Sequence, residues 1–197
     1  MHPNEGGIFI KSTIHNTNTH TASSDVNENN KSEIGKKASI DGFAHEHIVL
    51  GILMKKYQNV SLVDLPLSPY DIIIAFKEES GEESIIRCQV KTSRTSISFT
   101  GGSRGGVDRT YIAGKNNTKI YIQSPESSDI VIGIQPINEQ QYNLYFVPTL
   151  IIKELNQKTI SINKIQDFKN NYQILENCKN EQFVINKCIE YGILDRR

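Results

Sequence analysis

The stretch that decides the fold of this chain is residues 85–93, which read IIRCQVKTS. Side chains alternate between the two faces of a strand, so Gln89 and Lys91 lie on the same face. The alternate positions carry isoleucine, cysteine and valine, which suit a hydrophobic core. An amide and an ammonium on one side of a short apolar strand indicate either an exposed surface or a polar site.

A second apolar run, residues 72–76, precedes this strand, and a polar stretch with Gly81 separates the two. The pattern predicts a β-hairpin. With the turn centred near Gly81, Asp71 lies across from the end of the partner strand that carries Gln89 and Lys91, where opposite Cβ atoms are about 5 Å apart. A carboxylate, an amide and an ammonium then converge. A slip of one residue in the register would move Asp71 to the opposite face, so the convergence depends on that register.

The composition favours one ordinary domain in a reducing compartment. The chain has 197 residues, of which 37% are hydrophobic, and this is enough for a core. It contains no run of 18 apolar residues, and its first residues lack the features of a signal peptide. Three scattered cysteines argue against a disulfide framework and against a cysteine-built zinc site. We therefore expect a cytoplasmic protein with no membrane association.

The formal charge is zero, yet the basic residues concentrate in one segment. Residues 87–119 hold seven lysines and arginines and one aspartate, so seven minus one gives +6, and the rest of the chain carries −6. Such a segment offers an electrostatic footprint for DNA phosphates. It contains the string GGSRGG at 101–106, where glycine lets the backbone approach a ligand closely. A solvated basic loop without a ligand is the alternative.

The N-terminal part divides into an arm and a helix. Residues 1–35 are rich in Asn, Thr, Ser and His, which predicts a flexible polar arm, and residues 36–197 are predicted to form a single domain. That domain begins with a helix over residues 39–57, which contains Glu46. The apolar residues at helical spacing are Ile40, Phe43, Ala44, Ile48 and Ile52. An acid in a helix can be merely solvated, so Glu46 alone indicates no function.

Three further strands and a helical C-terminal part are predicted. The runs IYIQ (120–123), DIVIGIQPI (129–137) and YNLYFVPTLII (142–152) are typical of strands, and the last two form a predicted hairpin. From about residue 163 the chain is predicted to be helical, with one piece in INKIQDFKNNYQILENC (162–178) and a second near EQFVINKCIEYG (181–192). The apolar stripe that this part presents to the core consists of Ile165, Phe168, Tyr172 and Leu175.

The order of these elements resembles the PD-(D/E)xK nuclease superfamily, the restriction-endonuclease-like fold. The resemblance lies in PYDIII at 69–74, in QVK at 89–91 and in the preceding helix with Glu46, and it covers residues 39–155. It is similar to a subgroup that includes type II restriction enzymes and some intron-encoded endonucleases. The resemblance implies an α/β (α+β) fold with a restriction-endonuclease-like core, in which helices flank a mixed central β-sheet.

The resemblance also implies a site and a reaction. The expected activity is Mg²⁺-dependent cleavage of double-stranded DNA phosphodiester bonds, with Mn²⁺ as a substitute. Asp71 would be the main anionic metal ligand and Glu46 the second acid. The family usually has Asp or Glu where Gln89 stands, so the chain is a QxK variant that offers an uncharged amide oxygen. The backbone carbonyl of Val90 would be a further ligand. Lys91 would orient or deprotonate the attacking water; acids around it would keep it protonated, which favours charge stabilisation.

The basic segment then has a role in DNA binding. The expected DNA contacts are Ser93, Arg94, Arg104, Arg109 and Lys115. Because one such site cuts one strand, we expect a homodimer. The leading hypothesis is a type II restriction endonuclease, and the alternative within the enzyme class is an intron-encoded (homing) or resolvase-like endonuclease.

Two hypotheses from other classes stay open. The Gln89 substitution is compatible with a non-catalytic DNA-binding module whose nuclease site is degraded. A structural or protein-interaction domain, in which QVKTS is an ordinary strand, predicts no salt-dependent DNA affinity. A histidine metal site is disfavoured, because His45 and His47 lie about 200° apart around a helix.

Overall fold

The computed structural model describes residues 22–65, 68–77, 81–102 and 120–195. The chain forms two compact units, Met1–Ala38 and Ser39–Arg197, and the described part of the first unit is helical. The elements are α1 (Ala22–Met54), β1 (Asn59–Leu62), β2 (Ile72–Lys77), β3 (Glu83–Thr92), β4 (Ser96–Ser98), β5 (Thr100–Gly102), β6 (Ile120–Ile122), β7 (Ile130–Pro136), β8 (Tyr142–Pro148), η1 (Thr149–Ile151), α2 (Ile152–Leu155), β9 (Thr159–Ser161), η2 (Ile162–Phe168), α3 (Tyr172–Glu176) and α4 (Glu181–Glu190).

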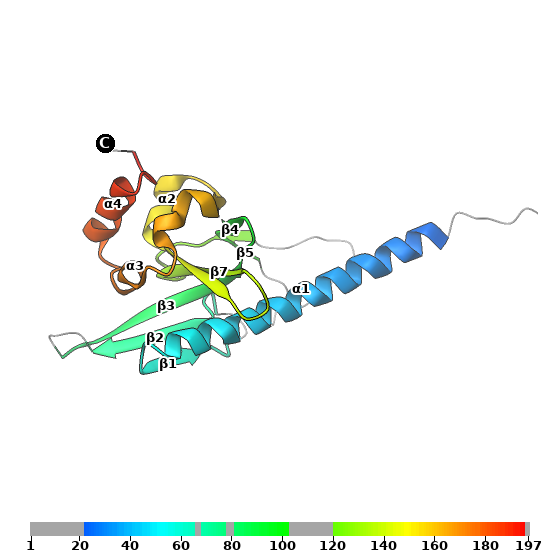
Figure 1. Ribbon diagram of the computed structural model, residues 1–197, viewed down its shortest axis with the longest axis horizontal. Helices are drawn as coiled ribbons and strands as arrows, with labels where there is room; N and C mark the ends of the chain where they lie inside the picture. The colour runs from blue at the N-terminus through cyan, green and yellow to red at the C-terminus, as the bar shows by residue number, and fades with distance from the viewer. Residues whose placement is uncertain (1–21, 66–67, 78–80, 103–119, 196–197) are drawn as a thin grey trace, which may run out of the picture. The chain divides into compact units, whose positions relative to one another are not determined.

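A five-stranded sheet with the order β1-β2-β3-β7-β8 forms the centre of the second unit. Its neighbours are antiparallel except for β3 and β7, which run parallel, so the sheet is mixed. Figure 1 shows α2 and α4 gathered on one side of β3 and β7. The predicted fold class is confirmed: this is an α+β protein with a mixed central sheet and flanking helices.

The predicted hairpin is present with the register that the site requires. Ile72 pairs with Cys88 in the β2–β3 ladder, and the backbone N–H of Asp71 donates to the carbonyl of Cys88 at 2.9 Å. Asp71 therefore lies at the Gln89 end of the partner strand. The turn uses Gly81 at a positive φ of 86°, a conformation that glycine adopts without steric cost.

One face of the sheet is apolar across three strands. Ile72, Cys88 and Ile130 lie opposite one another in successive ladders, and all three are fully buried. The other face carries Gln89 and Lys91 on β3. Because residues that are directly opposite share a face, the register that buries the apolar positions also gathers the polar ones.

Helix α1 differs from its predicted form in length and in the face that it buries. It begins at Ala22, well before the predicted start at residue 39, and ends at Met54. Ile40 and Phe43, two of the residues at helical spacing that predicted this helix, are 68% and 64% exposed, whereas Val49 and Leu53 are fully buried. Both buried residues come from the dense apolar run 48–53, and their four-residue spacing defines the face that packs on the domain.

The C-terminal part is less continuously helical than predicted. The 3-10 helix η2 ends at Phe168, and Asn170 then adopts a positive φ of 52° before α3 begins. Lys169 forms a β-bridge to Tyr145 of β8, so pairing with the sheet replaces the helical hydrogen bonds at this point. The predicted core stripe is confirmed: its isoleucine, phenylalanine and leucine are fully buried, and its tyrosine packs on the core as a partly buried residue.

Candidate active site

Asp71 and Gln89 meet on the polar face of the hairpin. The Nε2 atom of Gln89 donates a hydrogen bond to Oδ2 of Asp71, and the backbone N–H of Val90 donates to the same oxygen at 2.7 Å. Burial raises the pKa of Asp71, and the Val90 hydrogen bond and the charge of Lys91 act in the opposite direction. The sequence therefore brings a partly buried carboxylate against neutral N–H donors.

Lys91 lies two residues beyond Gln89, opposite Gly133 of β7. Burial lowers its pKa, and the charges of Asp71 and Glu46 oppose that shift. The neighbouring acids favour the protonated form of Lys91 as predicted, but desolvation has the larger effect on its pKa. The ammonium form of Lys91 is thus less favoured here than in water.

Packing of α1 places Glu46 near the sheet residues. Glu46 is three positions before the buried Val49, and its neighbour His45 has Nδ1 2.8 Å from Oγ1 of Thr92, at the end of β3. The pKa of Glu46 is raised to about 7, first by burial and then by the charge of Asp71. The charge of Lys91 lowers it. Glu46, Asp71 and Lys91 therefore form one electrostatically coupled group.

The oxygen atoms of this group fit a hard divalent cation better than a softer metal. Among the described residues, no three or more His, Cys, Asp or Glu side chains form a group that could hold a metal ion, so a cation here would also need backbone, amide or water oxygens. The donors here are the carboxylates of Asp71 and Glu46 and the carbonyl of Val90, and such oxygen ligands suit Mg²⁺, which also keeps several waters. The Gln89 amide turns its nitrogen to Asp71, and its oxygen lies 3.3 Å from Nε2 of Gln123.

A second polar cluster lies on the same face of β3, and the sequence analysis did not identify it. Arg87 makes two contacts to the carboxylate of Asp129, at 2.8 and 3.2 Å, and donates to the carbonyls of Pro125 and Glu126. The sequence analysis counted Arg87 among the basic residues that could attract DNA phosphates. Its guanidinium is instead paired with Asp129, so Arg87 has a structural role. The cluster fixes the connection between β6 and β7 against β3.

That connection carries Gln123, a buried residue that the sequence analysis also missed. Gln123 is 1% exposed, and its Oε1 accepts hydrogen bonds from the hydroxyls of Ser127 and Ser128. In the sequence it appears only as a polar residue at the end of the apolar run IYIQ. Its position beside Gln89 depends on a contact across 34 residues, which no local pattern indicates.

The predicted DNA contacts fall into three groups. Ser93 is 1% exposed and its hydroxyl faces the carbonyl of Lys91 at 3.3 Å, so it offers no surface to a phosphate and we leave it out of the proposed contacts. Arg94 is exposed directly after the site strand. Arg104, Arg109 and Lys115 lie outside the described residues, and their roles stay predictions.

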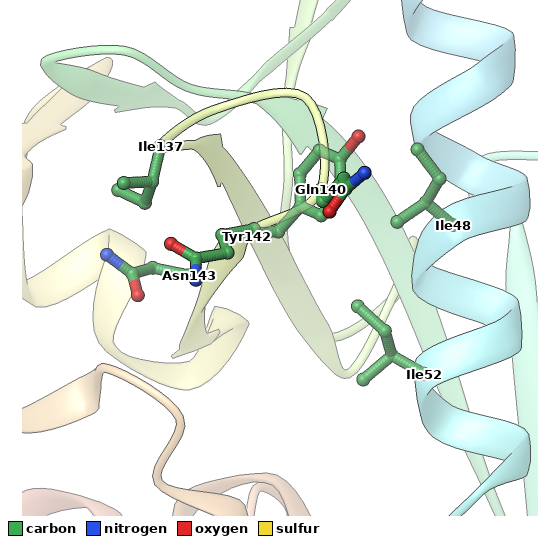
Figure 2. Close-up of a pocket in the computed structure, with 7 residues that line it drawn as sticks. Ile48, Ile52, Ile137, Gln140, Tyr142 and Asn143 are labelled. Carbon is green, nitrogen blue, oxygen red and sulfur yellow. The ribbon is translucent and has the colours of Figure 1, made fainter.

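A cavity of about 690 Å³ lies between α1 and the turn that joins β7 to β8. Figure 2 shows Ile48 and Ile52 extending from α1 on one side of it, with Tyr142 across from them. The lining residues are Ile48, Ile52, Ile137, Gln140, Gln141, Tyr142 and Asn143. No carboxylate or lysine is among them, so this cavity is separate from the coupled acid–lysine group.

Comparisons with known proteins support the fold. The structure matches a solved bacterial homing endonuclease with a TM-score of 0.50 and 10% sequence identity, over 70% of this chain and 91% of that chain. At this identity the likeness concerns the fold. No protein-family model matches the sequence, and a search of curated proteins found no match. Within the described part of the chain, no helix has the length and apolar character needed to cross a membrane.

Proposed function

We propose that this chain is a divalent-metal-dependent endonuclease that cleaves double-stranded DNA. The observation that carries the proposal is the hydrogen bond between Gln89 and Asp71 on the face of β3 that also carries Lys91, with Glu46 near enough to interact electrostatically with Asp71 and Lys91. The same arrangement of elements occurs in a protein described as a homing endonuclease, which supports this general activity.

In this proposal the carboxylates hold the metal ion and the lysine acts on the water and the phosphate. Asp71 and Glu46 supply negative charge, and the Val90 carbonyl supplies a further oxygen. Bound Mg²⁺ or Mn²⁺ lowers the pKa of a water molecule and neutralises charge that develops on the phosphate. Lys91 orients the attacking water and, as an ammonium, offsets phosphate charge.

The solved neighbour favours the homing-type alternative over the restriction enzyme that the sequence first suggested. Arg94 and the basic residues of 103–119 are proposed to contact DNA phosphates. Cleavage of both strands requires two such sites, so we keep the homodimer as part of the proposal.

The first test is incubation of supercoiled plasmid and a pooled genomic DNA with the full chain in Mg²⁺, Mn²⁺ or EDTA. We expect metal-dependent nicking or linearisation that is lost in Lys91→Ala. Lys164→Ala, which changes an exposed lysine on η2, is the matched control and should retain activity. Sequencing of the cut ends gives the length and frequency of the recognised sequence, and these distinguish a restriction enzyme from a homing-type endonuclease.

DNA retention without cleavage, unchanged in Lys91→Ala, would instead indicate a non-catalytic binding module. In that case the affinity should still fall steeply with salt, because phosphate contacts release counterions. A complete lack of salt-dependent affinity contradicts both the nuclease and the binding-module proposals.

A further inference from the structure

The side-chain amide of Gln89 faces the site with its nitrogen. Nε2 donates to Oδ2 of Asp71 and, at 3.2 Å, to the backbone carbonyl of Val90. These are two of the oxygens assigned to the metal ion above, so this inference rests on the proposed function. The Gln89 nitrogen links two oxygens that would repel each other without a donor or a cation between them.

A second amide, Gln123, determines which end of Gln89 faces Asp71. The Nε2 atom of Gln123 lies 3.3 Å from Oε1 of Gln89. Its own Oε1 accepts from the hydroxyls of Ser127 at 2.7 Å and Ser128 at 2.8 Å. An amide has a donor at one end and an acceptor at the other. The Pro69 carbonyl, which can only accept, lies 3.5 Å from Nε2 of Gln123. This carbonyl and the two hydroxyls together favour the observed orientation of Gln123, and Gln123 orients Gln89.

The network has a second arrangement, which gives up the 3.5 Å contact from Nε2 of Gln123 to the carbonyl of Pro69 and the hydrogen bond that the Ser128 hydroxyl donates. If both amides turn over, Nε2 of Gln89 donates to Oε1 of Gln123, and the serine hydroxyls accept from Nε2 of Gln123. Ser127 can change role because its hydroxyl has a second acceptor, the carbonyl of Ser124 at 2.9 Å. The Gln89 oxygen then joins the carboxylate and carbonyl oxygens of the site, and converging oxygens are the ligands that a hard cation needs.

We propose that the Gln89 and Gln123 amides turn over together between these arrangements, and that Gln123 is a positioning residue that sets how strongly the site binds a divalent cation. The cation binds to the arrangement in which both amides have turned over. The free energy needed to turn them therefore lowers the apparent affinity of the site for the cation. The Arg87–Asp129 ion pair fixes the segment that carries Gln123. With the backbone of this segment fixed, the orientation of the two side-chain amides is what can change when a cation binds.

Calorimetric titration of the full chain with Mg²⁺ tests this proposal. The carboxylate of Gln123→Glu only accepts hydrogen bonds, so it holds the Gln89 NH₂ group in the turned arrangement. We expect Mg²⁺ to bind about tenfold more tightly, the equivalent of one hydrogen bond of ordinary net strength. The added negative charge is controlled by repeating the change in a Gln89→Met background, where the gain should disappear. A gain that persists undiminished in that background overturns the proposal.

Ser128→Ala provides a second variant in case Gln123→Glu does not fold. It removes one of the two hydroxyls that hold Gln123 in its observed orientation, without adding charge. We expect Mg²⁺ affinity to rise about two- to threefold, because part of a hydrogen bond's net strength is lost from one arrangement only. An unchanged or lower affinity counts against the proposal.

The NMR signals of the side-chain NH₂ groups provide a readout that a merely structural role would not move. On addition of Mg²⁺ we expect the ¹H–¹⁵N signals of Gln89 and Gln123 to shift together at one midpoint. Mg²⁺ binding with both signals unmoved overturns this inference and leaves the endonuclease proposal intact. Coupled shifts without any DNA cleavage support the inference and contradict the endonuclease proposal.

Discussion

Two polar clusters lie on the same face of β3, at Arg87 and at Lys91 four residues further on, and they differ in whether their buried charges are paired. At Arg87 the guanidinium meets the 7% exposed carboxylate of Asp129 at 2.8 Å. At Lys91 the described residues show no ion pair within 4.0 Å, and Asp71 is held by neutral N–H donors. The ion pair of the Arg87 cluster stabilises the fold, whereas in the Lys91 cluster the ammonium and the carboxylates do not form an ion pair. Shifted pKa values without a paired partner are typical of functional sites.

The contrast between the two clusters would be contradicted most directly if the negative charge of Asp71, in the Lys91 cluster, were unnecessary for activity. In Asp71→Asn we expect the rate of plasmid cleavage in Mg²⁺ to fall about 10³-fold, which corresponds to about 4 kcal/mol of transition-state stabilisation. The free energy of unfolding, measured with urea, should stay unchanged or rise, because a partly buried charge is removed. Retained cleavage would show that Asp71 is not a metal ligand.

The Arg87 cluster should show the opposite behaviour. Arg87→Ala removes the closest charged partner of the buried Asp129 carboxylate and leaves it the Lys179 ammonium at 3.9 Å and the backbone N–H of residue 87. We therefore expect the free energy of unfolding to fall by about 3 kcal/mol. Arg94→Ala, a control at an exposed arginine that is in none of the ion pairs of the described residues, should change it by less than about 0.5 kcal/mol. Equal effects of the two substitutions in urea unfolding would remove the distinction between the clusters.

A third prediction concerns Gly133, which lies opposite Lys91 in the β3–β7 ladder. The absence of a side chain at Gly133 allows Ile97 of β4 to pack closely beside the Lys91 cluster. A Cβ atom at this position would lie 2.7 Å from Cγ1 of the fully buried Ile97 and closer still to its Cδ1. We expect Gly133→Ala to destabilise the protein by about 1–3 kcal/mol through overpacking. Gly51→Ala has open space in α1 and should stabilise by about 0.5–1 kcal/mol. Matching signs in thermal unfolding would contradict this packing argument.

The smallest expected effect is a pH dependence that only the second cluster should show. With the pKa of Glu46 raised to about 7, the apparent Mg²⁺ affinity should rise about tenfold per pH unit below 7 and level off above it. Because the folded pKa exceeds the ordinary 4.5, the contribution of Glu46 to stability is present below pH 4.5 and is lost as pH rises through 7. Glu46→Gln should flatten the calorimetric affinity profile, and an unaltered profile would assign the titration to another group.

The sequence predicts the local part of the site because one hairpin contains it. The alternation of IIRCQVKTS and the turn at Gly81 are enough to place Asp71 beside Gln89. The helical spacing did not identify the fully buried residues of α1. Ile48 and Ile52 do pack against the core, but the apolar residues suit more than one helical face, and only tertiary packing selects Val49 and Leu53 for full burial.

The partners of the site strand across the sheet could not be predicted. Gln123 contacts Gln89 across 34 positions and Asp129 contacts Arg87 across 42, and a single sequence carries no signal for such pairs. Ser93 shows the reverse error: a polar residue beside the motif suggests a DNA contact, but the fold buries it. Residue type indicates the chemistry here, and long-range packing decides which groups reach it.

The parallel pairing of β3 with β7 has a consequence for the order of folding. The β2–β3 and β7–β8 hairpins each close a short loop, whereas Cys88 and Ile130 are 42 positions apart, and distant pairings form slowly. We therefore expect the two hairpins to form first and to dock later, so that Asp71 meets Gln89 early and Gln123 arrives only on docking. Pulse-labelled hydrogen exchange during refolding, read at the amides of β3 and β7, would show whether protection appears in that order.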